Sequence, residues 1–240
     1  MRRTVFVTAT DTEVGKTILA ATIVAGLRAQ GLTVRARKPV ITGAPEPARL
    51  VATDAELGAL ADDELLAALS GERPQEVAML RFALPASPHL AAAGAGTTID
   101  CERILGALRA EAQRAEALVV EGIGGLLVPF AVGWDVRRLA AELDWPVLIA
   151  ARPTLGTINH TLLTLEAARS AGLDVRAVVL TPWPAEPDEI ARSNRATIEQ
   201  LGAVEVAVLE RMSVINRTSL ERAAATLRYE RWLAPRDQSS

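Results

Sequence analysis

The chain has 240 residues, of which 50% are hydrophobic, 23% are charged and 3% are aromatic. This length and hydrophobic content suit one large domain with an ample core. The formal net charge of −3 provides no basic footprint for nucleic acid, and the scarcity of aromatic side chains argues against a base-stacking surface.

A single cysteine, Cys101, excludes a disulfide within the chain and fits a reducing compartment. The first apolar run, residues 5–7, is too short for a signal peptide, and acidic residues follow it. No apolar run approaches the ~20 residues of a membrane helix. We therefore expect a cytoplasmic protein without a membrane partner.

The N-terminal segment predicts a strand, a loop and a helix. Residues 5–8 are apolar or β-branched, and Gly15-Lys16-Thr17 opens a helix predicted over Ile18–Gln30. This layout is typical of a phosphate-binding loop, because backbone N–H groups and the helix dipole at a helix start favour an anion. Lys16 can then reach the β- and γ-phosphates of a nucleotide, and the Thr17 hydroxyl can bind Mg²⁺.

The rest of the chain predicts strands that alternate with helices. Strands are predicted over residues 32–37, 76–82, 117–121, 146–150, 175–180 and 204–208. Helices are predicted over residues 54–68, 101–115, 135–143, 156–171 and 187–201. Residues 40–49 and 84–90 are predicted loops, and residues 213–240 are weakly patterned.

Apolar strands that alternate with helices indicate a doubly wound, mainly parallel α/β sheet with helices on both faces. No low-complexity linker divides the chain, so we expect a single domain over residues 1–240. Ligands of such sheets bind at the carboxyl ends of the strands. The informative residues are therefore those that follow each strand.

Three charged residues lie at the ends of predicted strands or at the start of a predicted helix. Lys38 ends the second strand, Glu121 stands between four apolar residues and a glycine-rich stretch, and Asp54 begins a predicted helix. Lys38 could also be a solvated strand end, and Asp54 could be a helix N-cap. Glu121 has no evident packing role. Because Mg²⁺ prefers hard oxygen ligands beside phosphates, Thr17, Asp54 and Glu121 are the candidate metal ligands.

Residues 10–17, with the sequence TDTEVGKT, resemble the phosphate loop of dethiobiotin synthetases. Four further motifs resemble the same family in the same order along most of the chain: Lys38-Pro39-Val40, Ser87-Pro88-His89, Val120-Glu121-Gly122 with Gly124-Gly125, and Leu155-Gly156 with Ile158-Asn159-His160. The phosphate-loop string TDTEVGKT is specific to the family. The four other motifs are weak individually and strong together.

The resemblance implies a homodimeric P-loop enzyme of biotin synthesis. Its substrates would be 7,8-diaminopelargonic acid, CO₂ or bicarbonate, and MgATP, and its products would be dethiobiotin, ADP and phosphate. One amine of the diamine takes up CO₂ to give a carbamate, which ATP phosphorylates. The second amine then attacks the mixed anhydride and closes the ureido ring.

The resemblance also implies roles for individual residues. The residues around the reacting groups would be Lys16, Lys38 and Thr12. The nucleotide would contact Glu13, Val14, Gly15, Lys16, Thr17 and Thr181. The substrate would contact Thr12, Lys38 and Thr42, and its carboxylate would lie at the helix start formed by Leu155, Gly156 and Asn159 of the neighbouring subunit.

The chain departs from the family at two places. Ala9 replaces the usual glycine before the loop, which keeps that position small. Thr181-Pro182 replaces an asparagine that reads adenine in many members, so other nucleoside triphosphates are expected to serve as well.

Two other classes of P-loop protein are alternatives for this sequence. A partitioning or positioning ATPase shares the fold, but it has a lysine at the place of Asp11. A glutamine-dependent amidotransferase needs a nucleophilic cysteine, and Cys101 lacks the glycine-rich elbow of such a residue. Fold alone does not separate these classes, whereas the loop and Lys38 do.

Overall fold

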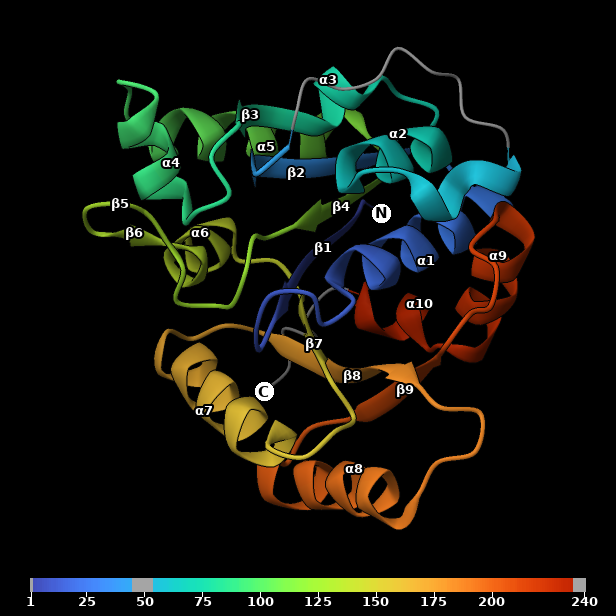
Figure 1. Ribbon diagram of the computed structural model, residues 1–240. Helices are drawn as coiled ribbons and strands as arrows, with labels where there is room; N and C mark the ends of the chain where they lie inside the picture. The colour runs from blue at the N-terminus through green and yellow to red at the C-terminus, as the bar shows by residue number, and fades with distance from the viewer. Residues whose placement is uncertain (1, 45–53, 235–240) are drawn as a thin grey trace.

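A seven-stranded parallel sheet forms the centre of the computed structural model, which describes residues 2–44 and 54–234 (Figure 1). The strand order is β3-β2-β4-β1-β7-β8-β9, and every neighbouring pair is parallel. The strands are β1 (Arg3–Ala9), β2 (Val34–Thr42), β3 (Ala78–Phe82), β4 (Ala117–Glu121), β7 (Val147–Ala151), β8 (Val175–Trp183) and β9 (Val206–Glu210). The predicted fold class is confirmed.

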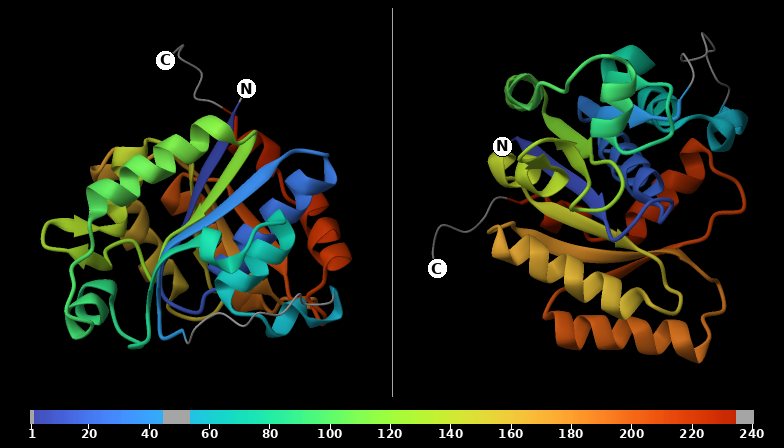
Figure 2. Two further views of the ribbon diagram at one scale, coloured as in Figure 1. Left: turned by 90° about the horizontal axis from the view of Figure 1, so that it is seen from above. Right: turned by 60° about the vertical axis from the view of Figure 1, so that its left-hand side comes forward.

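Helices cover both faces of this sheet, as the two views of Figure 2 show. One face carries α1 (Lys16–Ala29), the 3₁₀-helix η1 (Asp54–Ala59), α2 (Asp62–Ser70), α3 (Pro74–Val77), α9 (Arg217–Thr226) and α10 (Tyr229–Trp232). The other face carries α4 (Pro88–Gly94), α5 (Cys101–Arg114), α6 (Val136–Leu143), α7 (Thr157–Ser170) and α8 (Glu189–Gly202). Successive side chains of a strand point to opposite faces of the sheet, so Val5 and Val7 pack under α1 while Phe6 packs on the other face.

Strand β2 changes partner halfway along its length. Residues 34–37 pair with β4, whereas the pairing with β3 runs from Lys38↔Ala78 to Thr42↔Phe82. Pro39, which follows Lys38, has no N–H to offer a strand ladder, in keeping with this change. The prediction that the strand ends at Lys38 is therefore wrong: Lys38 lies inside β2, where β2 and β4 part.

Three local predictions also need correction. The helix predicted over residues 54–68 is two elements, η1 and α2, separated by Leu60 and Ala61. The loop predicted over residues 84–90 becomes α4 at Pro88, because proline fits the first turn of a helix. The extended segment predicted from Glu76 begins as the last turn of α3. A small hairpin of β5 (Pro129–Ala131) and β6 (Trp134–Asp135) was not predicted.

The weakly patterned C-terminal segment folds against the helix that follows the phosphate loop. Leu220 and Trp232 are fully buried in the core on this face. A Cβ built on Gly26 of α1 would lie 2.7 Å from the Ala224 Cβ and 2.8 Å from the Tyr229 hydroxyl oxygen. Glycine at this position thus lets α9 and α10 lie close against α1.

Candidate active site

The phosphate loop connects the end of β1 to the start of α1. Gly15 has a left-handed backbone with φ of 91°, and a Cβ at this position would lie 2.8 Å from the Thr181 Cγ2. Glycine is therefore required by both conformation and space. The first backbone N–H groups of α1 have no partner within the helix and can bind an anion.

Lys16 lies at the first position of α1 and is buried. Its ammonium donates a hydrogen bond to the Asp11 carbonyl oxygen, at 2.8 Å. Burial lowers the pKa of Lys16 from 10.5 to about 8, although the charge of Glu121 opposes this shift. A phosphate bound on the loop would place a negative charge next to this ammonium.

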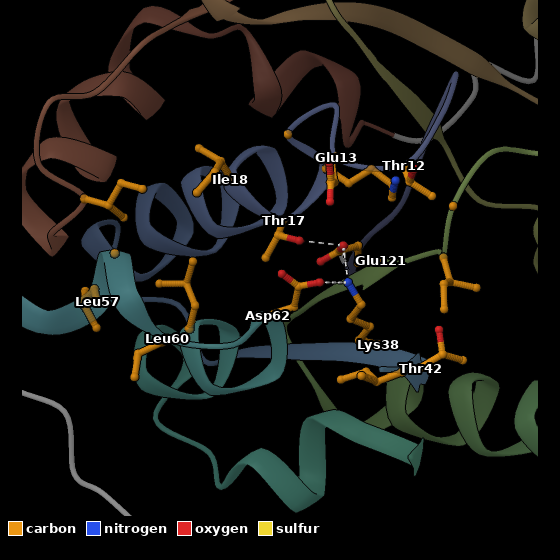
Figure 3. Close-up of a pocket in the computed structure, with 18 residues that line it drawn as sticks. Thr12, Glu13, Thr17, Ile18, Lys38, Thr42, Leu57, Leu60, Asp62 and Glu121 are labelled. Atoms are coloured by element: carbon orange, nitrogen blue, oxygen red, sulfur yellow. Dashed lines mark hydrogen bonds and ion pairs between the residues drawn. The ribbon is translucent and has the colours of Figure 1, made fainter. Parts of the chain in front are cut away.

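A second charged cluster lies beside the loop, where four elements meet (Figure 3). The Lys38 ammonium from β2 contacts Glu121 Oε1 of β4 at 2.6 Å and also contacts the Asp62 carboxylate at the start of α2. The Thr17 hydroxyl donates to the same Glu121 oxygen at 2.8 Å. Glu121 is 1% exposed, whereas the Asp62 side chain is half exposed.

Burial and mutual charge set the protonation of this cluster. Burial raises the pKa of Glu121 despite the nearby Lys38 charge. Burial alone would lower the pKa of Lys38, but the carboxylates of Glu121 and Asp62 outweigh it and the pKa is raised. The Lys38 charge likewise outweighs burial and lowers the pKa of Asp62. Lys38 is therefore a fixed cation at neutral pH.

The oxygen atoms of this cluster fit a divalent cation. Glu121 Oε2 is buried and has no hydrogen-bond partner among the described residues. The Thr17 hydroxyl and the Asp62 carboxylate lie beside it. The described residues contain no group of three or more metal-binding acidic, histidine or cysteine side chains, but Mg²⁺ held by phosphates and water needs only one or two carboxylates.

Asp62 is a site residue that the sequence did not reveal, since the predicted helix ran through it without a break. Asp54, the ligand proposed from the sequence, begins η1, and its side chain lies outside the described part of the structure.

A cavity of about 480 Å³ opens between the loop and the charged cluster, a size suited to small molecules. It gathers most of the predicted site residues: Thr12, Glu13, Gly15, Lys16, Thr17, Lys38, Thr42 and Glu121. Its apolar wall includes Ile18, Leu57, Leu60, Leu65 and Ile215. In Figure 3, Thr12 and Thr42 lie at one end of the cavity, and Leu57 and Leu60 lie at the other.

The remaining predicted residues lie around this cavity. Val14 is buried in the core, and Thr181 is buried with its side chain against Gly15. Leu155, Gly156 and Asn159 lie at the start of α7 and do not line the cavity of their own chain. The Leu155 side chain is 88% exposed.

The parallel sheet, with a phosphate loop between β1 and α1, defines a P-loop nucleoside triphosphatase. A family model described as an AAA domain matches residues 3–218. By sequence, the chain belongs to the dethiobiotin synthetase family. Relatives named ATP-dependent dethiobiotin synthetase BioD include one from Anaeromyxobacter dehalogenans, which is 42% identical and matches 83% of this chain and 85% of its own.

Two further relatives carry the same name. The one from Mycobacterium sp. (strain KMS) is 34% identical over 95% of this chain and 96% of its own. The one from Bacillus cereus (strain B4264) is 37% identical over 84% of this chain and 80% of its own.

Solved structures similar to this chain share its fold at low sequence identity. A ParA family ATPase from Chlorobium tepidum TLS aligns with a TM-score of 0.54 at 12% identity, over 99% of this chain and 93% of its own. Cyanthece apo McdA aligns with a TM-score of 0.52 at 14% identity, over 97% and 95%. These likenesses concern the fold alone.

Proposed function

We propose that this protein is an ATP-dependent dethiobiotin synthetase that converts 7,8-diaminopelargonic acid, CO₂ and ATP to dethiobiotin, ADP and phosphate. The observation that carries the proposal is the buried Lys38–Glu121 pair beside the phosphate loop, in a chain of this family. A partitioning ATPase is disfavoured, because Asp11 occupies the place of its loop lysine.

The reaction needs no nucleophile from the protein, because the substrate supplies both amines. One amine attacks CO₂ and loses a proton to form a carbamate. A carbamate oxygen attacks the γ-phosphorus and ADP leaves, which gives a carbamic–phosphoric anhydride. The second amine attacks the carbamoyl carbon and phosphate leaves as the ring closes. The protein's task is to position these groups and to neutralise their charge.

The charged side chains divide this task by position. Lys16, on the loop, would bind the β- and γ-phosphates, and Lys38 would neutralise the carbamate oxygens next to them. Thr17 and Glu121, with Asp62 or Asp54, would hold Mg²⁺. That ion, when bound, reduces the negative charge of the phosphates.

The loop and the cavity walls would orient the two substrates. Thr12 and Thr42, at the same end of the cavity, would contact the diamine or its carbamate. Glu13, Val14, Gly15, Lys16 and Thr17 would surround the phosphates. Thr181, whose side chain lies next to Gly15, would also be close to the nucleotide. CTP or GTP would be accepted as substrates in place of ATP, because Thr181 does not provide the donor and acceptor pair with which an asparagine recognises adenine.

The start of α7 would complete the site of a second subunit in a homodimer. Leu155, Gly156 and Asn159 lie outside the cavity of their own chain, and Leu155 is highly exposed. Backbone N–H groups at this helix start would bind the substrate carboxylate. Mixing a Lys16→Ala subunit with an Asn159→Ala subunit should restore activity through hybrid sites. Monomers in sedimentation at working concentration would rule out this arrangement.

The cytoplasm is the proposed location, on the grounds of the single cysteine and the family. Among the described helices, none has the length and apolar character needed to cross a bilayer.

The test of the proposed function is incubation with the diamine, bicarbonate and MgATP, with dethiobiotin detected by mass. Reactions that lack each component in turn, and a Lys38→Ala variant, are the controls. ATP hydrolysis that proceeds without the diamine and yields no dethiobiotin would favour an ATPase switch instead.

A further inference from the structure

One residue of the phosphate loop has a backbone conformation that its side chain disfavours. Glu13 has a left-handed backbone with φ of 53°, which is uncommon for residues other than glycine, asparagine and aspartate. Such a conformation persists only when its surroundings impose it. The contacts of the neighbouring peptide groups therefore decide whether the loop keeps its shape.

Two cations hold the consecutive carbonyl groups that precede Glu13. Lys16 Nζ donates to the Asp11 carbonyl oxygen at 2.8 Å, and Arg152 Nη2 donates to the Thr12 carbonyl oxygen at 3.0 Å. Lys16 belongs to the loop itself. Arg152 comes from 140 positions further along the chain, so its hydrogen bond joins the loop to another part of the fold.

The backbone at Arg152 is well fixed relative to the loop. Arg152 directly follows β7, whose residue Ala150 pairs with Ala9 at the end of β1. The Thr10 N–H also donates to the Ala150 carbonyl oxygen at 3.0 Å. The loop and the stem of Arg152 thus start from adjacent, hydrogen-bonded strand ends.

Arg152 reaches the loop from the side away from the large cavity. It lines a separate cavity of about 80 Å³ together with Thr10, Asp11 and Val14, and it does not line the 480 Å³ cavity. Because a trans peptide directs its C=O and N–H oppositely, holding the Thr12 carbonyl also orients the Glu13 N–H. Oriented N–H groups in such loops form the concave surface that binds phosphate.

Arg152 has no carboxylate within salt-bridge distance in the described part of the chain. The nearby Asp11 carboxylate accepts a hydrogen bond from the Thr12 N–H at 2.7 Å. The hydrogen bond of Arg152 to the loop is therefore not a by-product of an ion pair.

We infer that Arg152 is a positioning residue, which holds the Thr12–Glu13 peptide so that the loop is ordered for a polyphosphate before the nucleotide binds. This inference rests on the proposed nucleotide-binding function of the loop. A loop that must be ordered by its ligand binds that ligand more weakly, since part of the binding free energy is spent on ordering.

The test compares the binding of ADP and AMP by calorimetry in Arg152→Ala, Arg152→Lys and the wild type. Arg152→Ala should weaken ADP binding about tenfold, the effect of one charge-assisted hydrogen bond. AMP lacks the β-phosphate that the loop binds, so its affinity should change less than about twofold. Arg152→Lys keeps a donor and should recover most of the ADP affinity. The KM for ATP should rise in Arg152→Ala, with kcat at saturating ATP retained.

Arg192→Ala is the matched control, because Arg192 is also exposed and donates to a backbone carbonyl, that of Pro187, next to α8. It should bind ADP like the wild type. Unchanged ADP affinity in Arg152→Ala, or equal losses for ADP and AMP, would overturn the inference. A wild-type protein that binds no ADP would instead overturn the proposed function.

Discussion

Two ionic clusters form around Arg37 and Lys38, two buried neighbours in β2, and they differ in how completely their polar atoms are paired. Arg37, whose side chain is 5% exposed, contacts Glu72 at 2.7 Å and Glu111 at 2.9 Å. The second Glu72 oxygen accepts the Ala36 N–H at 2.9 Å, and Arg35 shares Glu111 at 2.6 Å. None of these side chains lines the cavity beside the phosphate loop.

The cluster around Lys38 is incomplete by comparison. Glu121 has one buried oxygen without a hydrogen-bond partner among the described residues, and Asp62 is half exposed at the wall of the large cavity. Buried polar atoms in folded proteins are nearly always paired, so an exception needs an explanation. We therefore expect the Arg37 cluster to stabilise the fold, whereas the Lys38 cluster can accept a ligand at its unpaired oxygen.

The largest expected effect is on the stability of the fold, and it comes from a change in the Arg37 cluster. Arg37→Ala should lower the free energy of unfolding by about 3 kcal/mol, because it removes a buried cation that pairs with two partly buried carboxylates, Glu72 and Glu111. The kcat/KM of the folded fraction should stay close to the wild-type value. Urea unfolding and activity assays measure the two quantities. Arg35→Ala, at a side chain 37% exposed, should cost about 1 kcal/mol or less. A selective loss of activity in Arg37→Ala would contradict the comparison.

Lys38→Ala should show the opposite behaviour. Turnover should fall by about 10²–10³, the usual effect of losing one preorganised electrostatic contact, and Lys16→Ala should do the same. Unfolding should change less than in Arg37→Ala, because the pKa of Glu121 is already raised by burial and its carboxyl can take up a proton. The measurements are kcat for dethiobiotin formation and the urea midpoint. Near-normal turnover would remove Lys38 from the site.

Glu121→Gln tests whether the unpaired oxygen is a metal ligand. Losing an outer partner of a metal site costs about 10–100-fold in affinity, so losing a direct ligand should raise the half-saturating Mg²⁺ concentration at least about tenfold. Calorimetric titration of Mg²⁺ into the ADP complex measures this directly. Glu111→Gln, in the Arg37 cluster, is the control and should leave Mg²⁺ binding unchanged. Equal Mg²⁺ affinity in both variants would refute the assignment.

The smallest expected effect concerns recognition of the nucleotide base. Thr181 is buried against Gly15, so its side chain is not presented as a paired donor and acceptor for adenine. Losing one such hydrogen bond changes affinity by about three- to tenfold. GTP and CTP should therefore support kcat/KM within about tenfold of ATP. A preference for ATP above about a hundredfold would show that backbone groups read adenine.

The sequence predicted the sheet, the phosphate loop and Glu121 because their signals are local. Apolar runs mark strands, and a lone acid after such a run has no packing role. Asp62 escaped prediction because the break between η1 and α2 has no strong sequence signal, so the predicted helix ran through this residue. The contact of Arg152 with Thr12 was not predicted, because it spans 140 positions. The proposed roles of the site residues remain predictions.

The C-terminal helices were missed for a related reason. α9 and α10 are short, and their polar faces hide the few apolar residues, such as Leu220 and Trp232, that enter the core. What orders them is α1, and tertiary packing of this kind overrides weak local preference.

The packing of α9 and α10 on α1 also bears on the order of events at the ribosome. The phosphate loop emerges before α9 and α10, yet the helix behind it is covered by side chains about two hundred positions later, including Tyr229, whose hydroxyl accepts a hydrogen bond from Gln30 at 2.7 Å. Synthesis proceeds at about 5–20 residues per second, so α1 waits on the order of ten seconds or more for its cover. A nascent chain halted before Leu220 would expose the apolar back of α1 to chaperones.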